Sequence, residues 1–415
     1  MIRLGAVLLA LTALVPAAQA IDWHPAVRET FLLDREWTNP LPPGTAVRAG
    51  NLAEAADHLD PVLAKLIADG LVEVTVAAAA SFAPHDAYID ATGTVSLGDA
   101  PGVLLGYRAG RPFAEALSAD DSRAGEKLAW NIRHAYGGDG GTIEPMVWRY
   151  IDMASGKVER TIRMKAASLL FRHRLFDSAG PDILPNPSGI FRALYLRVAA
   201  PRDIAGTQLL VHRLSDDHAR ERSWMYHANQ RRVRLLASGQ TTDAFLGSDI
   251  MIEDFLGYNG RIVDMTWTYR GRRDLLLPFF VDETAGAEVG FAGQGGCFPA
   301  VTWQVRPADI LEAVPKDRRH PLSKRVFYVD AQTATIALGN IYDRAGTLWK
   351  LGIAAFTHPD HHHPQNAGTG APILTAVAMI DLQARHCTTI SGTSRVDGRL
   401  SPRQFTVNSL RAHGR

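Results

Sequence analysis

The chain has 415 residues, of which 46% are hydrophobic and 21% are charged. A chain of this length and composition can bury a large core, as one large domain or two smaller ones, and is not disordered by composition. Its 44 basic and 43 acidic residues give a formal net charge of +1, so no strong field attracts nucleic acid or an anionic membrane. A role in binding nucleic acid is therefore not expected.

The first residues have the pattern of a secretory signal peptide. Arg3 precedes an apolar run from Leu4 to Val15, and Ala18-Gln19-Ala20 places small residues at a cleavage position. The run is too short to span a bilayer, which takes about 20 residues. We expect residues 1–20 to be removed near Ala20, leaving a mature protein that works outside the cytoplasm and does not span the membrane.

The chain contains two cysteines, Cys297 and Cys387. In an oxidising compartment they can form one disulfide, which the chain-entropy model values at roughly 4 to 5 kcal/mol for a loop of this size. The alternative is a pair of buried, unpaired thiols. The sequence alone leaves both possibilities open.

The part of the chain from residue 21 to 145 is interpreted as a helical and irregular extension that packs on the domain after it. Asn51 and Glu54 resemble a capping box, and apolar residues then recur at helical spacing up to Gly70. A second helix is expected from Ser122 to His134. The glycine cluster at 137–141 is interpreted as a mobile loop, because no strand precedes it and no GK[ST] follows it.

From Met146 to the end, short segments rich in β-branched and aromatic residues alternate with turn signals such as Ala154-Ser155-Gly156. The expected strands are 147–153, 158–171, 190–198, 207–214, 223–227, 231–236, 262–270, 274–281, 325–330, 335–342, 347–356, 373–381 and 386–391. Successive strands joined by tight turns predict an antiparallel sheet, which at this width curls to cover one face. The fold class is therefore mainly β (α+β), with a large curved antiparallel sheet or incomplete β-barrel over residues 146–415.

Two segments carry the most specific patterns. In Trp224–Arg234, aromatic residues and arginines alternate across a turn at Ala228-Asn229, so one face of a hairpin can be apolar and the other basic. Residues 247–255 present Ile250 and Phe255 and are interpreted as a short segment that plugs the mouth or interior of the curved sheet. Asp249, Glu253 and Asp254 within it could form a pair of carboxylates for acid–base chemistry, but a role as caps or solvent-facing residues is the expected one.

These two segments and the hairpin from Arg325 to Lys350 resemble a bacterial periplasmic family of unknown function that is likened to the lipoprotein-sorting carriers LolA and LolB. Tyr107–Phe113 and Lys127–Asn131 fit the same family. The resemblance implies an incomplete barrel wrapped around helical segments, with an apolar cavity that shelters a lipid-like ligand in the periplasm. It also implies a transport partner, an inner-membrane exporter of the resistance-nodulation-division type, and neither a catalytic group nor a cofactor.

A carrier of this kind needs an apolar groove and no catalytic residues, since burying an acyl chain gains about 0.8 kcal/mol per methylene. Arginines at the rim would hold an anionic head group. The alternative is ordinary core packing for the aromatic residues and solvent contact for the arginines. The candidate ligand-binding residues are Trp224, Tyr226, Phe255, Trp267 and Tyr269, with Arg231 and Arg232 at the rim.

The main alternative is a metal-binding protein or a metal-dependent periplasmic enzyme that uses the histidine-rich segment 358–363. His358, His361 and His363 are side chains that can bind zinc, copper or nickel. However, the flanking prolines break any helix that would place two of them on one face, and the sequence has no HExxH, GxSxG or CxxC motif. A polar loop is the simpler interpretation of this segment.

Overall fold

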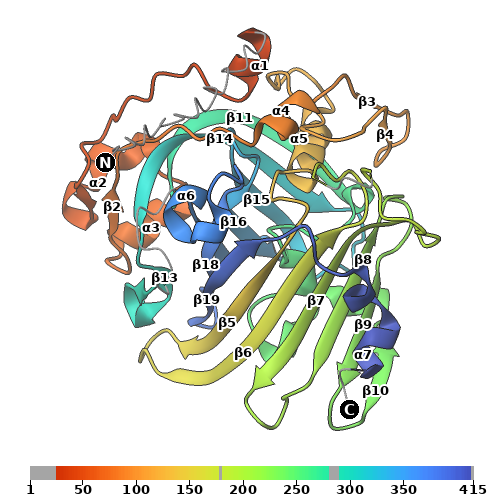
Figure 1. Ribbon diagram of the computed structural model, residues 1–415. Helices are drawn as coiled ribbons and strands as arrows, with labels where there is room; N and C mark the ends of the chain where they lie inside the picture. Colours follow the sequence, from red (N-terminus) through yellow and green to blue (C-terminus); the bar gives the residue numbers. More distant parts are fainter. Residues whose placement is uncertain (1–24, 177–179, 280–288, 413–415) are drawn as a thin grey trace, which may run out of the picture.

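The computed structural model describes residues 25–176, 180–279 and 289–412 (Figure 1). The signal peptide expected over residues 1–20 lies outside these ranges. The described chain is mostly β, with few helices, and its largest feature is a 15-stranded sheet that is strongly curved and not closed. The predicted fold class is therefore confirmed.

The helices of the described chain are short. They are α1 (Pro25–Thr30), α2 (Leu52–Ala55), α3 (Pro61–Ala68), α4 (Asp86–Asp90), α5 (Ala124–Arg133), α6 (Pro359–His362) and α7 (Val407–Ala412). Within the described ranges, none of them has the length and apolar character needed to cross a bilayer.

The strands lie mainly after residue 140. The large sheet contains β1 (Ala46–Val47), β2 (Val74–Val76), β5 (Gly140–Asp152), β6 (Val158–Leu170), β7 (Ile190–Ala200), β8 (Gln208–Leu214), β9 (Arg222–His227), β10 (Arg232–Leu235), β11 (Met265–Leu277), β14 (Thr302–Pro315), β15 (Leu322–Asp330), β16 (Ile336–Asp343), β17 (Leu348–Thr357), β18 (Ile373–Asp381) and β19 (His386–Val396). Two small hairpins pair β3 (Ser96–Leu97) with β4 (Leu104–Leu105) and β12 (Phe291–Ala292) with β13 (Phe298–Pro299).

The order of the strands explains why the sheet has edges. β11 pairs with β14, the sheet continues through β15 to β19, and β19 pairs with β5, which leads through β6 to β10. The pairs along this path are antiparallel, whereas β2 joins β14 in parallel at Thr302 and Trp303. β10 and β11 are therefore the two ends of the antiparallel path.

One face of the sheet, which we call the inner face, packs on a single segment, residues 244–255. Every strand from β15 to β9 contributes an apolar side chain to the core around this segment, from Leu322 on β15 to Met225 on β9. Strands lie about 4.8 Å apart, so β15 and β8 would be roughly 40 Å apart in a flat sheet. A short segment can reach them all only because the sheet curves around it. The interpretation of 247–255 as a plug is thus confirmed.

The inner face continues over β11, β14 and β15, where α5 covers it. Leu128 and Trp130 of α5 belong to one core with Trp267 and Phe327 of the sheet. The approach is close because α5 carries Gly125, at which a Cβ atom would lie 2.6 Å from the carbonyl oxygen of Trp267. The helix expected over 122–134 is therefore confirmed as α5.

The opposite face, which we call the outer face, is covered by three separate parts of the chain. α2, α3 and the β12–β13 hairpin lie over the strands from β11 to β19 and the end of β5. The C-terminal residues Phe405 and Leu410 cover β6 to β9. Both faces of the sheet are thus largely buried by the chain itself.

The helix expected between Asn51 and Gly70 is interrupted. α2 ends at Ala55, and α3 starts at Pro61 after Asp60, whose carboxylate accepts the backbone N–H of Leu63 at 2.8 Å. A residue before proline avoids the helical conformation, so Asp60-Pro61 starts a new helix. The expected capping box is also wrong, because the Asn51 side chain accepts the N–H of Arg48 instead.

Three strand predictions need correction. The glycine cluster is not entirely a loop, since β5 already begins at Gly140. The segments 262–270 and 274–281 belong largely to one strand, β11, whose pairing with β14 is irregular between Tyr269 and Arg272. The 14-residue strand β14 was not predicted at all.

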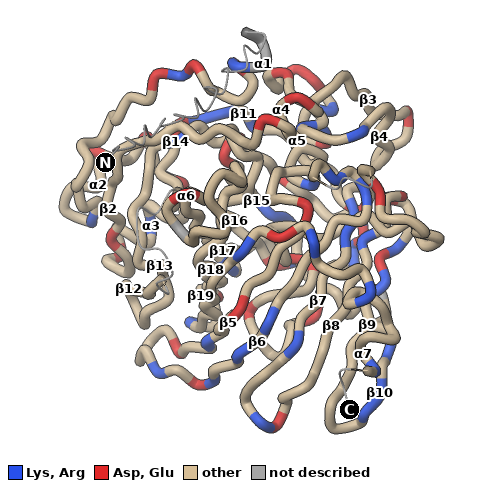
Figure 2. The backbone as a smooth tube through the Cα atoms, viewed as in Figure 1, with Lys and Arg blue, Asp and Glu red and all other residues tan. Residues whose placement is uncertain are grey.

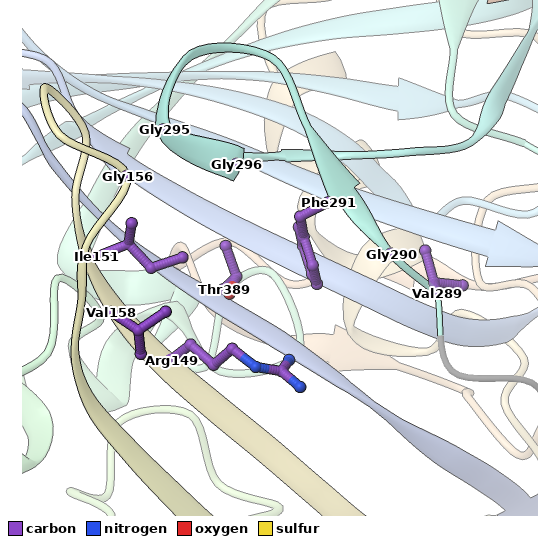
Figure 3. A pocket seen from close by; sticks show the side chains of 10 residues that line it. All are labelled: Arg149, Ile151, Gly156, Val158, Val289, Gly290, Phe291, Gly295, Gly296 and Thr389. Carbon is purple, nitrogen blue, oxygen red and sulfur yellow. The ribbon is translucent and has the colours of Figure 1, made fainter.

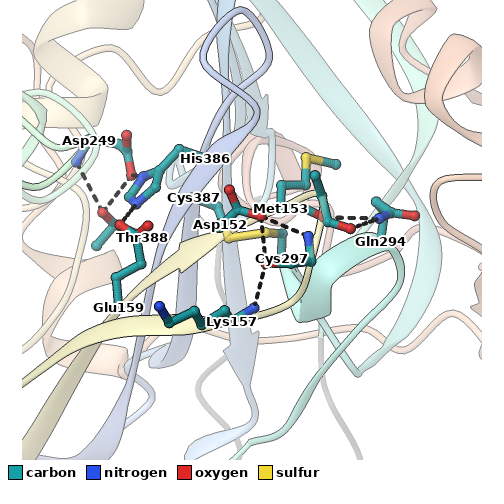
Figure 4. Close-up of a disulfide and its surroundings, with 12 residues drawn as sticks. Asp152, Met153, Lys157, Glu159, Asp249, Gln294, Cys297, His386, Cys387 and Thr388 are labelled. Carbon is teal, nitrogen blue, oxygen red and sulfur yellow. Dashed lines mark hydrogen bonds and ion pairs between the residues drawn. A yellow bond between two sulfur atoms is a disulfide. The ribbon is translucent and has the colours of Figure 1, made fainter.

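Cys297 and Cys387 form a disulfide, with Cα atoms 5.9 Å apart and both residues fully buried. The bond joins the turn of the β12–β13 hairpin to β19 (Figure 4). Of the two alternatives that the sequence left open, the bridge is the one observed.

Replacing both cysteines with alanine is expected to lower the free energy of unfolding by roughly 4 to 5 kcal/mol, because the two residues lie 90 positions apart. Urea unfolding followed by far-ultraviolet circular dichroism measures the change. As a control, a reducing agent should destabilise the wild type but leave the double variant unaffected. A loss below about 1 kcal/mol would show that the bond contributes little to stability.

Candidate functional site

Charged side chains hold the inner-face segment on the sheet. Arg325 of β15 is buried, and its Nη2 lies 2.8 Å from Oε2 of Glu253 and 3.0 Å from Oδ1 of Asp254. His320 lies 3.1 Å from Glu253 through Nε2, while its Nδ1 accepts the N–H of Leu322. That arrangement places the ring proton on Nε2, which donates to the carboxylate. The expected solvent-facing role of Glu253 is therefore wrong.

The ion pair determines the ionisation of this cluster. Burial would raise the pKa of the Glu253 carboxyl, but the charge of Arg325 and the hydrogen bond from His320 outweigh it and lower the pKa to about 2. Burial likewise disfavours the charge on Arg325, yet Glu253 and Asp254 together raise its pKa above the ordinary value. Both partners are thus ionised at neutral pH.

A second polar cluster holds the start of the same segment. Asp249 Oδ2 accepts hydrogen bonds from Thr388 Oγ1 at 2.7 Å and from His386 Nδ1 at 2.8 Å (Figure 4). Lys350 Nζ donates to the backbone oxygen of Asp249 at 2.7 Å. Both clusters therefore bond the inner-face segment to strands, and neither presents a pair of free carboxylates for acid–base chemistry.

Three of the predicted ligand-binding aromatics lie on the inner face. Phe255 packs edge-on against Trp148 and Phe245. Trp267 donates its indole N–H to the Ile262 carbonyl at 2.8 Å, and the Tyr269 hydroxyl donates to Asp309 at 2.8 Å. All three side chains therefore make contacts within the chain itself.

The other predicted residues lie elsewhere. Trp224 and Tyr226 point to the outer face, where they pack with the C-terminal Phe405 and Leu410. Arg231 and Arg232 are exposed in the β9–β10 hairpin, and basic residues recur along β10 (Figure 2). The structure does not gather the predicted residues on one surface, and their role in ligand binding stays a prediction.

The histidine-rich segment forms the short helix α6 and a following 3-10 turn, so the expected polar loop is wrong: Pro359 and Pro364 stand at the first positions of these turns, where proline is tolerated. His358 and His363 each use Nδ1 to accept a backbone N–H, from Asp360 and Gln365 respectively. The rings of His358 and His361 lie 5.0 Å apart. Among the described residues, no group of three or more histidine, cysteine, aspartate or glutamate side chains is placed to hold a metal ion.

An open groove of roughly 360 Å³ lies on the outer face, between β5, β6, β19 and the residues around the β12–β13 hairpin (Figure 3). Its walls are mainly apolar, with Ile151 and Val158 on the strands and Val289 and Phe291 on the other side. The sequence analysis did not predict this groove, because no local sequence pattern indicates that the distant β12–β13 hairpin packs beside β5.

Two polar residues lie among the apolar ones. Thr389 of β19 is fully buried, and its hydroxyl has no hydrogen-bond partner in the described part of the chain. A buried hydroxyl usually finds a partner. Arg149 of β5 lines the same groove and makes a long contact of 3.4 Å with the Ser391 hydroxyl. The groove therefore offers an apolar surface and a cation, while the Thr389 hydroxyl lies beneath its floor.

A glycine and the disulfide together fix the position of the β12–β13 hairpin beside β5. Gly295 has a positive φ of 66°, and a Cβ atom there would lie 2.6 Å from the carbonyl oxygen of Met153. Only glycine thus lets the hairpin turn approach the end of β5 so closely. Cys297, two residues later, is bonded to Cys387, which pairs with Ile151 across the sheet.

The fold and the groove define a class of protein, in which an open antiparallel sheet curves around a segment of its own chain and carries a mainly apolar groove on its outer face. Residues 46–411 match the model of a family described as protein of unknown function, DUF1329. The chain belongs to this family.

Individual relatives add little about activity. The chain is 27% identical over 243 residues to the uncharacterized protein PA3922 of Pseudomonas aeruginosa, and the match covers 55% of this chain and 50% of that protein. The chain thus spans about half the length of the curated relative it matches.

Two crystal structures are similar to the fold at 19% sequence identity. One is a putative outer membrane lipoprotein-sorting protein domain from Vibrio parahaemolyticus, with a TM-score of 0.48 and coverage of 70% of this chain and 100% of that chain. The other is a DUF1329 family protein from Desulfovibrio piger, with a TM-score of 0.49 and coverage of 70% and 99%. The family resemblance seen in the sequence is confirmed by the match of residues 46–411 to the family model.

Replacing Glu253 with glutamine is expected to lower the free energy of unfolding by about 3 kcal/mol, because Arg325 keeps its buried charge and loses a partner. The pKa of Glu253 is lowered from 4.5 to about 2 in the folded protein, so its stabilising contribution is present above pH 4.5 and is lost as the pH falls toward 2. Urea unfolding across this range should show a shallower pH dependence for the variant.

Asp264→Asn is the matched control. Asp264 pairs with Arg261 at the surface, with 44% of its side chain exposed, and such pairs contribute less than about 1 kcal/mol. If both variants lost the same stability, the buried cluster would have no special role in holding the segment.

Proposed function

We propose that this protein is a non-enzymatic carrier or adaptor in the periplasm that binds a hydrophobic or amphipathic molecule in the outer-face groove. The observation that carries the proposal is the combination of mainly apolar walls with the Arg149 guanidinium in one open groove. Such a site binds by burial of apolar surface and orients its ligand through a few polar atoms.

The apolar walls supply the affinity in this proposal. Ligand sites are typically a few hundred cubic ångströms in volume, and the groove, at roughly 360 Å³, holds one alkyl chain segment or one small ring system. Each buried methylene contributes about 0.8 kcal/mol. Contact with Ile151, Val158 and Phe291 therefore supports binding without any catalytic group.

Arg149 supplies the orientation in this proposal. The Arg149 guanidinium, on strand β5, favours an acidic head group. An amphipathic molecule with one polar end matches this distribution better than a pure hydrocarbon.

The wider role rests on resemblance. The likeness to LolA and LolB in sequence motifs, and a similar structure described as lipoprotein-sorting, fit envelope transport. An inner-membrane exporter of the resistance-nodulation-division type is the partner included in this proposal. Location in the periplasm fits the signal peptide expected at residues 1–20.

Phe291→Ala is expected to weaken binding of the neutral probe N-phenyl-1-naphthylamine by about tenfold, because the partly buried ring forms one wall of the groove. Fluorescence titration measures the dissociation constant. Leu184→Ala, at an apolar residue that is 78% exposed, is the control and should leave it unchanged. Equal binding by the wild type and Phe291→Ala would exclude the groove as the site.

Arg149→Met is expected to weaken binding of a fluorescent fatty acid anion, parinarate, by about tenfold while leaving the neutral probe within about twofold. The charge of Arg149 acts only on the anion, whereas the length of the side chain is preserved. Equal losses for both probes would indicate a packing role for Arg149 and would argue against head-group recognition.

A further inference from the structure

A second, smaller hollow of about 30 Å³ lies where the inner face ends, between α4, the end of α5, and β7. Its lining is unusually rich in rings, which come from Tyr88, Tyr107, His134, Tyr136, His173 and Phe191. The rings of Tyr107 and His134 lie 4.1 Å apart, and those of Tyr107 and His173 lie 4.8 Å apart. The hollow is separate from the outer-face groove, with which it shares no lining residue.

The charges near this hollow do not balance. Arg192 of β7, which lines it, lies directly opposite Arg213 in the ladder with β8, and like charges in that position repel each other. Arg213 has a partner in Glu221 at 2.5 Å, and Arg133 has a partner in Asp217 at 2.5 Å. The three guanidinium groups of Arg133, Arg192 and Arg213 are thus accompanied by only two carboxylates, those of Asp217 and Glu221.

Arg192 is the unmatched one. In the described part of the chain its guanidinium makes no hydrogen bond or ion pair, and its one ring contact is with Phe191 at 5.2 Å. Burial, and then the charge of Arg133, lower the pKa of Arg192 to about 10, so the group stays protonated at neutral pH. A partly buried guanidinium without a counter-ion is unfavourable.

The other titratable groups around the hollow do not supply the missing negative charge. Burial raises the pKa of Tyr107 well above 10, and burial together with His173 lowers the pKa of His134 well below its ordinary value, so both are neutral at pH 7. The Asp139 carboxylate also lines the hollow, but its two oxygens already accept the N–H groups of Leu175 and Phe176. Arg174 also lies 3.9 Å from Asp139.

We propose that this hollow is a binding site for the carboxylate group of a small organic acid, with Arg192 as its counter-ion and the apolar remainder of the acid lying at the opening of the hollow. Arginine suits a carboxylate because its fork donates two parallel hydrogen bonds. The volume, about that of two water molecules, has room for a carboxylate group but not for a whole aromatic acid, whose ring would remain at the opening. The inference does not rest on the proposed function of the outer-face groove.

Isothermal titration calorimetry of the full chain with sodium benzoate tests the proposal. Saturable binding is expected for the wild type, with benzyl alcohol and inorganic phosphate binding at least about tenfold more weakly. Arg192→Met should weaken benzoate binding by about tenfold or more, and Arg192→Lys by less. Phe291→Ala should bind benzoate normally, so failure of this site is distinguishable from failure of the groove.

Arg222→Met, at an exposed arginine of β9, is the matched control and should bind benzoate like the wild type. Without ligand, Arg192→Met should unfold at the same temperature as the wild type or higher, because a cross-strand repulsion is removed. No saturable benzoate binding by the wild type would overturn the proposal. Unchanged binding by a folded Arg192→Met, or equal affinity for benzyl alcohol, would also overturn it.

Discussion

An open sheet of this width has two apolar faces, and both must be kept from water. A closed barrel would bury its inner face against itself, but here β10 and β11 end the path of antiparallel strands. The chain covers the inner face with residues 244–255 and α5, and the outer face with α2, α3, the β12–β13 hairpin and the C-terminal residues. The position of every candidate binding surface follows from this division.

The inner-face segment is held by charge as well as by apolar contact. Arg325 is buried with two carboxylates from the segment, and Lys350 and Thr388 bond to Asp249 a few residues earlier. Apolar contacts alone would allow the segment to shift along the sheet, whereas these ion pairs and hydrogen bonds form in only one alignment of segment and strands. A carrier with a roomy inner face would need this segment to leave, at the cost of exposing Arg325 without partners. The structure therefore favours ligand sites at places where the chain has not filled the space, the outer-face groove and the hollow beside Arg192.

The sequence predicted features that local patterns determine. The alternating segments gave most of the strands, because side chains of a half-buried strand alternate between faces. The apolar residues of 247–255, among polar neighbours, indicated a plug. β14 was not predicted because it contains Arg306 and Asp309, and charged residues usually lie at the surface. In the fold both are buried in ion pairs. Glu253 was misread for the same reason, since its partner Arg325 lies 72 positions away.

The candidate ligand residues show a different limit. The alternation at Trp224 and Tyr226 correctly separated two faces of the β9–β10 hairpin, yet it could not tell which face is inner. That choice depends on the curvature of the whole sheet and on the C-terminal residues Phe405 and Leu410, which lie far along the chain. The aromatic residues were recognisable as a group of buried side chains, but their assignment to one groove required the tertiary structure.

The disulfide links the location of the protein to its proposed activity. One wall of the outer-face groove consists of strands β5, β6 and β19, and the other includes residues of a hairpin that is joined to β19 through Cys297 and Cys387. Gly295 allows the close approach of the hairpin, and Gln294 donates to the Met153 carbonyl at 2.9 Å through its side chain and to the Leu71 carbonyl at 2.7 Å through its backbone N–H. In a reducing compartment the disulfide would be absent, and the two walls would be held together by packing and these hydrogen bonds. The disulfide therefore adds to the stability of the groove only in an oxidising compartment, to which a signal peptide would direct the chain.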